Sequence, residues 1–543
     1  MKGLRKIVSC FLLMTVSQVM ASNPEAVPGE YILKLKKGAS VQKNVNALEK
    51  SLDIKVKRFI SNTDLAVVKI NDKNPTDFKA ITNRLMKNSQ VVFAEPNYIY
   101  RINRVPNDPE LGKLWGMINH GQPDSSNSKG VSGVDIGAEA AWDIETGKQD
   151  LLIAVIDTGM DYTHSDLKDN AWTNMAELNG SPGVDDDNNG FIDDIHGYDF
   201  ANHDPDPMDD HGHGSHCSGT IGGKGNDGAG IVGVAWNVKI MGVKFLGADG
   251  GGTLEGAVEA IKYATKMGVK IMSNSWGGGG YSEALKEAIQ EAGEHGIVFT
   301  AAAGNSAQNN DESPAYPATY NLPNVISVAA IDNRGELATF SSYGRKTVHV
   351  SAPGVNVYSS IPGGYDSWSG TSMATPHVTG VVALLLSHEP NLNPEEVRTR
   401  LVRTSRPMPS LKGKTASNGL VNAYLALMNE QAPPDPNDPE NWTNFQAQSI
   451  ATEHPYKENT TQSWEVEIPG ANQIAVLFEQ FKTEARYDIV VLTNRKGEKI
   501  GEISGDAGDR WSSAIDGDYV KLTFKSDSSV NDFGFEIKKA AFR

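Results

Sequence analysis

Three short segments of this chain carry side chains that can take part in nucleophilic catalysis. Asp157 ends the apolar run at 153–156, His213 lies within His-Gly-His-Gly-Ser-His at 211–216, and Ser372 lies within Gly-Thr-Ser-Met-Ala-Thr-Pro-His at 370–377, ahead of an apolar helical stretch. A carboxylate at a strand end could hold an imidazole through its Nδ1–H group. A serine at a helix N-terminus has backbone N–H groups beside it, which favour developing negative charge. The three residue types together could therefore perform acyl transfer.

Each segment has a simpler explanation when it is taken alone. Asp157 could be an ordinary strand-end carboxylate, and Ser372 could be a helix N-cap. A second hypothesis is a zinc hydrolase, because His211, His213 and His216 have a spacing suitable for metal ligands. That hypothesis leaves the segment at 370–376 unexplained. The occurrence of all three segments in one chain favours catalysis by serine.

These segments, in the order Asp, His, Ser, resemble the three signatures of the subtilase (subtilisin-like) serine protease family. The resemblance covers about 320 residues, and three motifs matching in order is a specific signal. It implies that Ser372 is the nucleophile, that His213 is the general base and then the acid, and that Asp157 orients the imidazole. Ala-Ala-Ala-Gly-Asn at 301–305 matches the oxyanion segment, so Asn305 would stabilise the tetrahedral oxyanion together with the Ser372 N–H.

The resemblance also implies a cleft that binds an extended polypeptide by adding it as a strand. Gly250, Gly251 and Gly252 would form one edge, and Ser275, Trp276 and Gly277 the other. Two further residues, Ala303 and Gly304, would line the pocket for the P1 side chain together with Trp276 and Gly277, with Ala315 near its base. Ser306 stands where an acidic residue would attract basic side chains. We therefore expect a preference for large apolar or aromatic P1 residues.

The region that carries these segments has the pattern of an α/β fold. Between residues 106 and 430, continuous apolar runs alternate with amphipathic helical patterns, which predicts a buried parallel sheet flanked by helices. The predicted strands are at 151–156, 238–245, 269–274, 297–303 and 325–330, and predicted helices include 254–267 and 282–295. Ligands gather at the carboxyl ends of such strands. Asp157 lies at one of these ends.

An acidic stretch at 185–194 predicts a calcium site. Its sequence Asp-Asp-Asp-Asn-Asn-Gly-Phe-Ile-Asp-Asp fits the beginning of an EF-hand-type loop, although the bidentate terminal Glu is absent. Calcium prefers oxygen ligands, and the carboxylates would repel one another without a cation. The alternative is a solvated acidic loop, and Asn226–Asp227 is a weaker second candidate. The predicted ligands are Asp185, Asp187, Asn189, Asp193 and the carbonyl of Phe191.

The N-terminal part reads as an export signal followed by a small domain. Residues 1–21 have a basic start, a short apolar core and a small-residue cleavage site. Residues 22–105 carry 15 Lys and Arg against 8 Asp and Glu, ahead of an acidic body. Alternating strands and helices predict an α+β unit, and its end at 92–98 resembles the end of subtilase inhibitory propeptides. The resemblance implies that the unit chaperones the enzyme, blocks its cleft and is cut off near residues 101–105.

Beyond a Pro- and Asp-rich linker at 431–440, short alternating strands predict a β-sandwich at 441–543. The segments at 481–488 and 524–535 resemble CUB-like domains, although the usual CUB cysteines are missing. In calcium-binding members, carboxylates at the places of Glu484, Asp488 and Asp527 hold the ion. A purely adhesive protein built on this sandwich is a third hypothesis. It would leave the catalytic segments without a role.

Composition limits the partners of the chain. A formal charge of −17 argues against a nucleic-acid partner. Cys10 leaves with the signal, so Cys217 is the only thiol expected in the mature chain, and we interpret it as a small buried residue. We expect a secreted monomer without a membrane anchor that acts on polypeptides and uses Ca²⁺.

Overall fold

The computed structural model describes residues 26–36, 45–61, 63–70, 78–98, 105–432 and 438–543. The chain divides into two compact units, residues 1–103 and residues 104–543. The predicted signal at 1–21, much of the predicted processing region and part of the predicted linker lie outside the described residues. Within the described ranges, no helix is both long enough and apolar enough to cross a bilayer.

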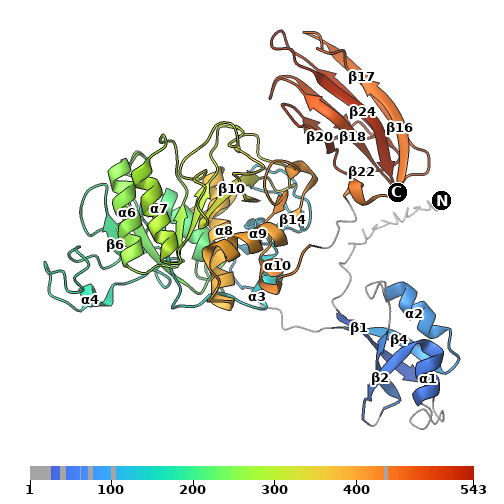
Figure 1. The fold of residues 1–543 in the computed structure, drawn as a ribbon, viewed down its shortest axis with the longest axis horizontal. Helices are drawn as coiled ribbons and strands as arrows, with labels where there is room; N and C mark the ends of the chain where they lie inside the picture. Colours follow the sequence, from blue (N-terminus) through green and yellow to red (C-terminus); the bar gives the residue numbers. More distant parts are fainter. Residues whose placement is uncertain (1–25, 37–44, 62, 71–77, 99–104, 433–437) are drawn as a thin grey trace, which may run out of the picture. The chain divides into compact units, whose positions relative to one another are not determined.

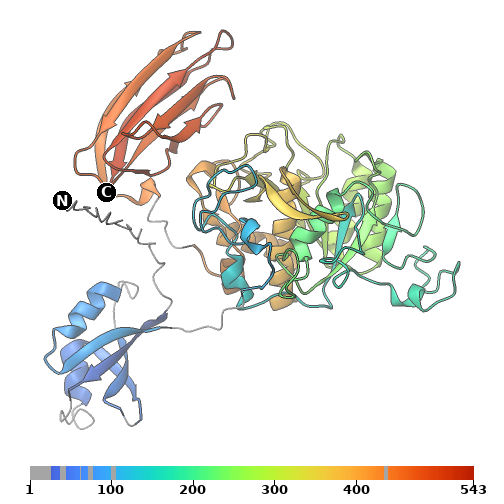
Figure 2. The same cartoon turned by 180° about the vertical axis from the view of Figure 1, so that it is seen from behind.

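The first unit is the α+β domain that the sequence predicts. Its elements are β1 (Ala26–Leu35), α1 (Val45–Leu52), β2 (Ile54–Phe59), β3 (Leu65–Ile70), α2 (Phe78–Met86) and β4 (Val91–Tyr98). The antiparallel sheet has the order β2-β3-β1-β4. Figures 1 and 2 show both helices on one side of this sheet, where Leu52, Ile81 and Leu85 pack on Leu33 and Val68. Strand β2 was not predicted, because its Lys- and Arg-rich sequence has no continuous apolar run.

The second unit contains a nine-stranded sheet that is almost entirely parallel. Its order is β14-β15-β11-β10-β9-β8-β5-β7-β6, and only β14 runs antiparallel to its neighbour. The strands are β5 (Leu152–Asp157), β6 (Gly197–Asp199), β7 (Lys239–Lys244), β8 (Ile271–Asn274), β9 (Val298–Ala302), β10 (Val325–Ile331), β11 (Val350–Pro353), β14 (Arg406–Pro407) and β15 (Gly419–Leu420). All five strands that the apolar runs predict are therefore confirmed.

Helices cover both faces of this sheet, and alternate residues of β5 show how. Ala154 and Ile156 pack with α6 (Leu254–Lys266) and α7 (Glu283–Glu294), which lie side by side in Figure 1. Ile153 and Val155 pack in the cluster that contains α8 (Thr371–His388) and α5 (His213–Gly222). The further helices are α3 (Ala138–Trp142), α4 (Met175–Leu178), α9 (Pro394–Thr404) and α10 (Ala423–Met428). Because both faces are buried, the strands read as continuous apolar runs.

A separate hairpin, β12 (Val357–Ile361) and β13 (Gly364–Trp368), precedes α8. The last part of the chain forms two antiparallel sheets. One holds β16 (Asn444–Ala451), β18 (Gln473–Lys482), β21 (Arg510–Trp511), β22 (Ile515–Asp516) and β24 (Gly534–Phe542). The other holds β17 (Thr461–Glu467), β19 (Ile489–Thr493), β20 (Lys499–Ile503) and β23 (Tyr519–Lys525). Apolar side chains of both sheets share one core, as expected for a β-sandwich.

Candidate active site

Asp157 and His213 meet at the carboxyl end of β5. Asp157 is the last residue of that strand and is fully buried, and His213 is the first residue of α5. The His213 Nδ1 lies 2.7 Å from Asp157 Oδ1, which also accepts the N–H of Thr158 at 2.8 Å. Burial alone would lower the pKa of His213, but the charge and hydrogen bond of Asp157, with a further contribution from Asp209, outweigh it and raise that pKa. The sequence prediction that these two side chains pair is consistent with this geometry.

Ser372 lies in the first turn of α8, next to the same pair. The Sγ of Cys217 connects the two: it lies within 4.8 Å of Asp157 and His213 ligand atoms, and it approaches the Ser372 carbonyl at 3.5 Å. The Ser372 Oγ donates to the Ser275 carbonyl at 2.9 Å, and the Ser275 Oγ donates back to the Ser372 carbonyl at 2.9 Å. The serine hydroxyl therefore points to the backbone just after β8 rather than to the imidazole in this structure.

Two hydrogen-bond donors converge beside Ser372. A Cβ atom placed on Gly370 would lie 3.5 Å from the Ser372 N and 3.6 Å from the Asn305 Nδ2. The orientation of the Asn305 amide is fixed, because its Oδ1 accepts both the N–H and the Oγ1–H of Thr371 at 2.9 Å. The Nδ2 donor therefore lies, like the Ser372 N, beside the space above Gly370 that a Cβ there would occupy. An anionic oxygen in that space would meet two donors.

The three histidines at 211–216 do not converge on one point. His213 Nδ1 faces Asp157, while His216 Nε2 lies 3.0 Å from the Val357 carbonyl and its ring stacks on Trp368 at 5.0 Å between centroids. Burial lowers the pKa of His216 to about 4. His211 is exposed, with its ring centroid 6.3 Å from that of His213. Among the described residues, no metal-capable group combines these three histidines, which gives the zinc hypothesis no support.

The residues predicted to form the two substrate edges lie at or near the carboxyl ends of β7 and β8. Gly250, Gly251 and Gly252 are exposed, and a Cβ on Gly250 would lie 3.5 Å from the His211 Nε2. On the other edge, Ser275 contacts the Ser372 backbone directly. The Trp276 ring packs against Phe245 at 4.8 Å between centroids.

One of the predicted P1 walls lies beside Tyr316, the residue that follows Ala315. A β-bridge joins Gly279 to Tyr316, and a Cβ on Gly277 would lie 3.1 Å from the Tyr316 carbonyl. Ala303 is fully buried, and Gly304 has a left-handed φ of 106° and donates to Thr371 Oγ1. Ala315 is half-buried and Ser306 is exposed.

The acidic loop forms a carboxylate group that differs from the predicted one. Asp185 and Asp187 are joined by Glu177 of α4, with ligand atoms of all three within 4.8 Å of one another. The Asn189 Oδ1 accepts the Phe191 N–H at 2.7 Å, and the Asp193 Oδ2 accepts the Gly183 N–H at 2.8 Å. The oxygens of Glu177, Asp185 and Asp187 likewise accept hydrogen bonds within the loop. Glu177 was missed because it precedes the loop motif, and no spacing rule relates it to that motif.

Glu484, Asp488 and Asp527 come together as predicted, with ligand atoms within 4.8 Å of one another. Asp488 is fully buried and accepts the Asp527 N–H at 2.8 Å. One oxygen of Glu484, Oε2, is buried without a hydrogen-bond partner. Burial, together with the charges of Asp527 and Asp488, raises the pKa of Glu484. An all-oxygen donor set with an unsatisfied carboxylate suits a hard cation.

A further carboxylate site was only partly anticipated. Asp108 is 4% exposed, and its Oδ1 has no hydrogen-bond partner, while its Oδ2 accepts the Asn226 N–H at 2.8 Å. Burial raises the pKa of Asp108, and the neighbouring charge of Asp227 adds to this effect. The sequence pointed to Asn226 and Asp227. It gave no signal that Asp108, 118 residues earlier, would face them.

The chain matches three family models. Residues 148–431 match the subtilase family, residues 15–97 match the fervidolysin N-terminal prodomain, and residues 440–538 match the CUB domain. Among solved structures, a protease from Pseudoalteromonas arctica PAMC 21717 is 28% identical with a TM-score of 0.47, covering 60% of this chain and 98% of that one.

Two of the similar proteins are named as serine or subtilisin-like proteases. A thermophilic serine proteinase of Bacillus sp. (strain AK1) is 35% identical over 419 residues, which cover 76% of this chain and 91% of that protein. Subtilisin-like protease 1 of Plasmodium berghei (strain Anka) is 36% identical over 304 residues, covering 53% of this chain and half of that protein. With a family model over more than half of its length and a relative of this similarity, the chain belongs to the subtilase family and is a subtilisin-like serine endopeptidase that carries an N-terminal prodomain and a CUB domain.

Proposed function

We propose that this protein is a secreted, calcium-dependent zymogen whose peptidase uses Ser372, His213 and Asp157 as its catalytic triad and Asn305 as an oxyanion donor. The observation that carries the proposal is the buried contact of 2.7 Å between Asp157 Oδ1 and His213 Nδ1, beside the first turn of the helix that bears Ser372. This contact leaves the Nε2 of His213 available as the base, because Nδ1 keeps its proton toward the carboxylate.

The first half of the reaction makes an acyl-enzyme. A rotation of Ser372 about χ1 releases its hydroxyl from the Ser275 carbonyl and brings Oγ to His213. Oγ then attacks the peptide carbonyl carbon as its proton passes to Nε2, and Asp157 stabilises the imidazolium. The carbonyl oxygen becomes anionic in the space above Gly370, where the Ser372 N–H and Asn305 Nδ2 donate to it. Breaking of the C–N bond of this tetrahedral intermediate completes the acyl-enzyme, as His213 gives its proton to the leaving amine.

The second half of the reaction restores the enzyme. A water molecule then attacks the ester carbonyl while His213 accepts a proton from that water. Collapse releases the carboxylic acid and returns the proton to Ser372 Oγ. No step consumes an oxidant, a reductant or a second substrate besides water.

We further propose that the P1 pocket prefers large apolar or aromatic side chains. Its expected walls are Trp276 with Gly277 and Ala303 with Gly304, and Ser306 offers no charge to a basic side chain. A peptide library cleaved by the mature enzyme tests this specificity. Predominant cleavage after Arg or Lys would overturn it. A Ser306→Glu variant serves as the matched comparison, and it should gain cleavage after Lys.

We propose that Ca²⁺ is bound for stability at three places, since each has only oxygen donors. These are the group of Glu177, Asp185 and Asp187, the group of Glu484, Asp488 and Asp527, and the partly unsatisfied Asp108 near Asp227. In the full-length chain, Asp488→Asn should remove one calcium equivalent from an equilibrium titration and leave peptide cleavage within about twofold. An unchanged calcium stoichiometry would show that the group of Glu484, Asp488 and Asp527 does not bind calcium.

The N-terminal unit is proposed to fold with, inhibit and then leave the peptidase. Its positive charge, against the acidic remainder of the chain, supports electrostatic attraction between the two. Lys34, Lys55 and Lys69 lie on the sheet face opposite the helices, as judged from the strand register. We expect the cut near residues 101–105 to depend on the enzyme's own Ser372.

Expression of the wild type and of Ser372→Ala tests the function directly. The wild type should be processed ahead of the peptidase domain and should cleave casein, while Ser372→Ala should remain uncut and inactive. Mass spectrometry after treatment with a phosphonate reagent should find the label on Ser372. If Ser372→Ala keeps casein hydrolysis, or if the label is absent from active wild type, the serine mechanism is wrong and a metal-dependent one must be considered.

A further inference from the structure

Behind the Asp157–His213 pair lies a second buried carboxylate, that of Asp209. It is 5% exposed, and it accepts five hydrogen bonds at 2.7–3.0 Å. Its Oδ1 receives the Oγ1–H of Thr158 and the N–H groups of His211 and Gly212. Its Oδ2 receives both the N–H and the Oγ–H of Ser215. Five donors on one carboxylate saturate its acceptor capacity.

This arrangement supplies the cap that α5 lacks by itself. Gly212, at the N-cap position, has no side chain to accept a hydrogen bond from the first turn. The N–H of Ser215, the third helical residue, is bound by Asp209 instead, and the N–H of Gly214 is bound by the Thr158 Oγ1 at 2.9 Å. A carboxylate at a helix N-terminus is favourable for the helix dipole as well. The position of His213, which begins this helix, therefore depends on Asp209.

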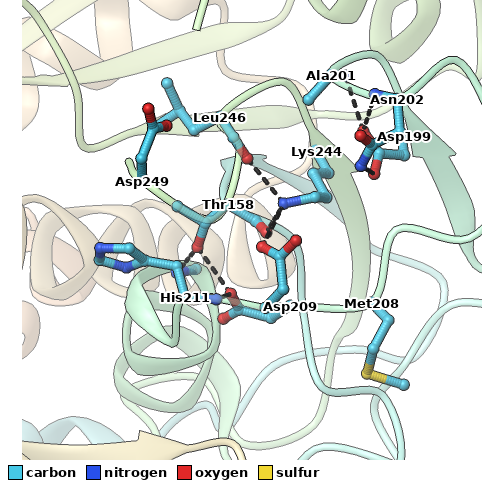
Figure 3. Close-up of polar contacts among 12 residues, drawn as sticks. Thr158, Asp199, Ala201, Asn202, Met208, Asp209, His211, Lys244, Leu246 and Asp249 are labelled. Atoms are coloured by element: carbon cyan, nitrogen blue, oxygen red, sulfur yellow. Dashed lines mark hydrogen bonds and ion pairs between the residues drawn. The ribbon is translucent and has the colours of Figure 1, made fainter. Parts of the chain in front are cut away.

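The same carboxylate reaches the strand that carries Asp157. Thr158 follows Asp157 directly, its N–H binds the Asp157 Oδ1, and its hydroxyl donates to Asp209 at 2.9 Å. Figure 3 shows Thr158 between Asp209 and the Lys244 ammonium, which donates to the carbonyls of Thr158 and Leu246. Asp157 and His213 are 56 residues apart in the sequence. Thr158 and Asp209 connect their two segments through hydrogen bonds.

Asp209 also places a negative charge near an imidazole that becomes positive during turnover. Around His213, the charged or titratable groups are Asp157 from β5, Asp209 from the preceding loop, His211 beside it, and His216 and Cys217 from α5. Lys244 of β7 forms an ion pair with Asp210, behind Thr158. The Asp209 carboxylate is shielded from solvent, so its field at His213 is weakly screened.

We propose that Asp209 is a positioning residue for His213: it holds the strand end that carries Asp157 against the start of α5, and its charge favours the imidazolium formed in the reaction. The inference rests on the proposed function, because it assigns His213 the role of the base. Asp209 does not touch the substrate in this proposal. It acts on the reaction only through His213 and Asp157.

The test is the pH dependence of peptide cleavage by full-length Asp209→Asn after maturation, with active sites counted by a phosphonate reagent. We expect kcat to fall about tenfold or more while KM changes less than about twofold. Removing the negative charge disfavours the imidazolium. The midpoint of the acidic limb of the kcat/KM profile should therefore shift to lower pH, by about half a unit. Asp206→Asn, an exposed carboxylate of the same loop, is the matched control, and it should leave both quantities unchanged.

A second pair of variants distinguishes a positioning role of Asp209 from a loss of folding. Thr158→Val removes the hydroxyl between Asp209 and the Asp157 strand, whereas Thr158→Ser keeps it. Thr158→Ser should retain the wild-type kcat, and Thr158→Val should have a lower kcat. Adding Asp209→Asn to Thr158→Val should lower kcat little further. A merely structural role would lower the melting temperature and the number of active sites without moving the acidic limb.

Two outcomes would overturn the inference. One is an acidic limb that stays at the wild-type pH in Asp209→Asn, and the other is an equal shift in Asp206→Asn. Failure of the proposed function would look different, because then the wild type would not show Ser372-dependent cleavage. If the Asp209→Asn zymogen does not mature, the His213 Nδ1 proton can be followed by NMR in Ser372→Ala backgrounds. Its titration should then move to lower pH when Asp209→Asn is added.

Discussion

The Asn305 Oδ1 accepts two hydrogen bonds from a single residue, Thr371, whose N–H and Oγ1–H both lie 2.9 Å away. Thr371 is fully buried and stands directly before the proposed nucleophile. Because the amide oxygen is occupied in this way, the Nδ2 group must face the space above Gly370. The proposed oxyanion donor is therefore oriented by the helix that carries Ser372.

Thr371→Val should weaken this orientation while preserving shape. One of the two hydrogen bonds to Asn305 is lost, so we expect kcat to fall about tenfold with little change in KM, because the oxyanion exists only in the transition state and intermediate. Thr371→Ser keeps the hydroxyl and should remain within about threefold of wild type. Steady-state kinetics on a peptide substrate measures both. Equal activity of the valine and serine variants would contradict the assignment.

Gly370→Ala tests the oxyanion space itself. The added methyl group would lie 3.5 Å from the Ser372 N and 3.6 Å from the Asn305 Nδ2, where the anionic oxygen should be. The φ of Gly370 is 165°, which is extended backbone that alanine can adopt, so the fold should be retained. We expect a loss of kcat of about a hundredfold or more, checked by kinetics beside a thermal melt. Retained activity would place the oxyanion elsewhere.

Cys217→Ala should keep peptidase activity. The thiol is fully buried, and burial raises its pKa well above the ordinary value, so it holds no thiolate for chemistry. Its Sγ lies within 4.8 Å of Asp157 and His213 ligand atoms, so a bulky mercurial bound there should separate His213 from Ser372. We expect mercurials to inhibit the wild type and to leave Cys217→Ala active. Loss of activity in the variant would show that the thiol has a catalytic role.

The acidic limb of activity should reach its midpoint above pH 6.5. Burial opposes protonation of His213, but Asp157 and then Asp209 outweigh burial and raise its pKa above the ordinary value of 6.5. Since the base must be neutral to accept a proton, a raised pKa means that activity is lost at a higher pH on acidification. The buried His216 and His377 have pKa values of about 4, so they stay neutral in this range. A kcat/KM profile with a midpoint well below pH 6 would contradict the geometry.

Removal of calcium should lower thermal stability, and Glu177 should account for part of that effect. A ligand that binds only the folded state stabilises it, so chelation should lower Tm and added calcium should restore it. Glu177→Gln should reduce the calcium-dependent part of Tm, while Asp186→Asn, a neighbouring carboxylate outside the group, should not. Differential scanning fluorimetry across a calcium series measures this. Identical calcium responses in the two variants would exclude Glu177 as a ligand.

Much of the site follows from local sequence. Asp157, Asn274 and Ala302 are the last residues of strands that the largely apolar runs predict, and such runs are typical of strands buried between two helical layers. Ser372 lies in the first turn of a long apolar helix, and His213 begins a short one, so the ends of the elements that carry the chemistry could be predicted. Strand β2 could not be predicted, because its Lys and Arg residues interrupt the alternation of buried and exposed side chains.

What the sequence by itself determined is the set of reactive residues and the ends of the elements on which they lie, because backbone periodicity and turn chemistry are local. The tertiary structure alone decided which atoms meet across long separations: Thr371 with Asn305, Asp209 with Thr158, and Asp108 with Asn226. These contacts depend on the order and register of strands and on packing between distant segments. No spacing within one segment encodes that geometry.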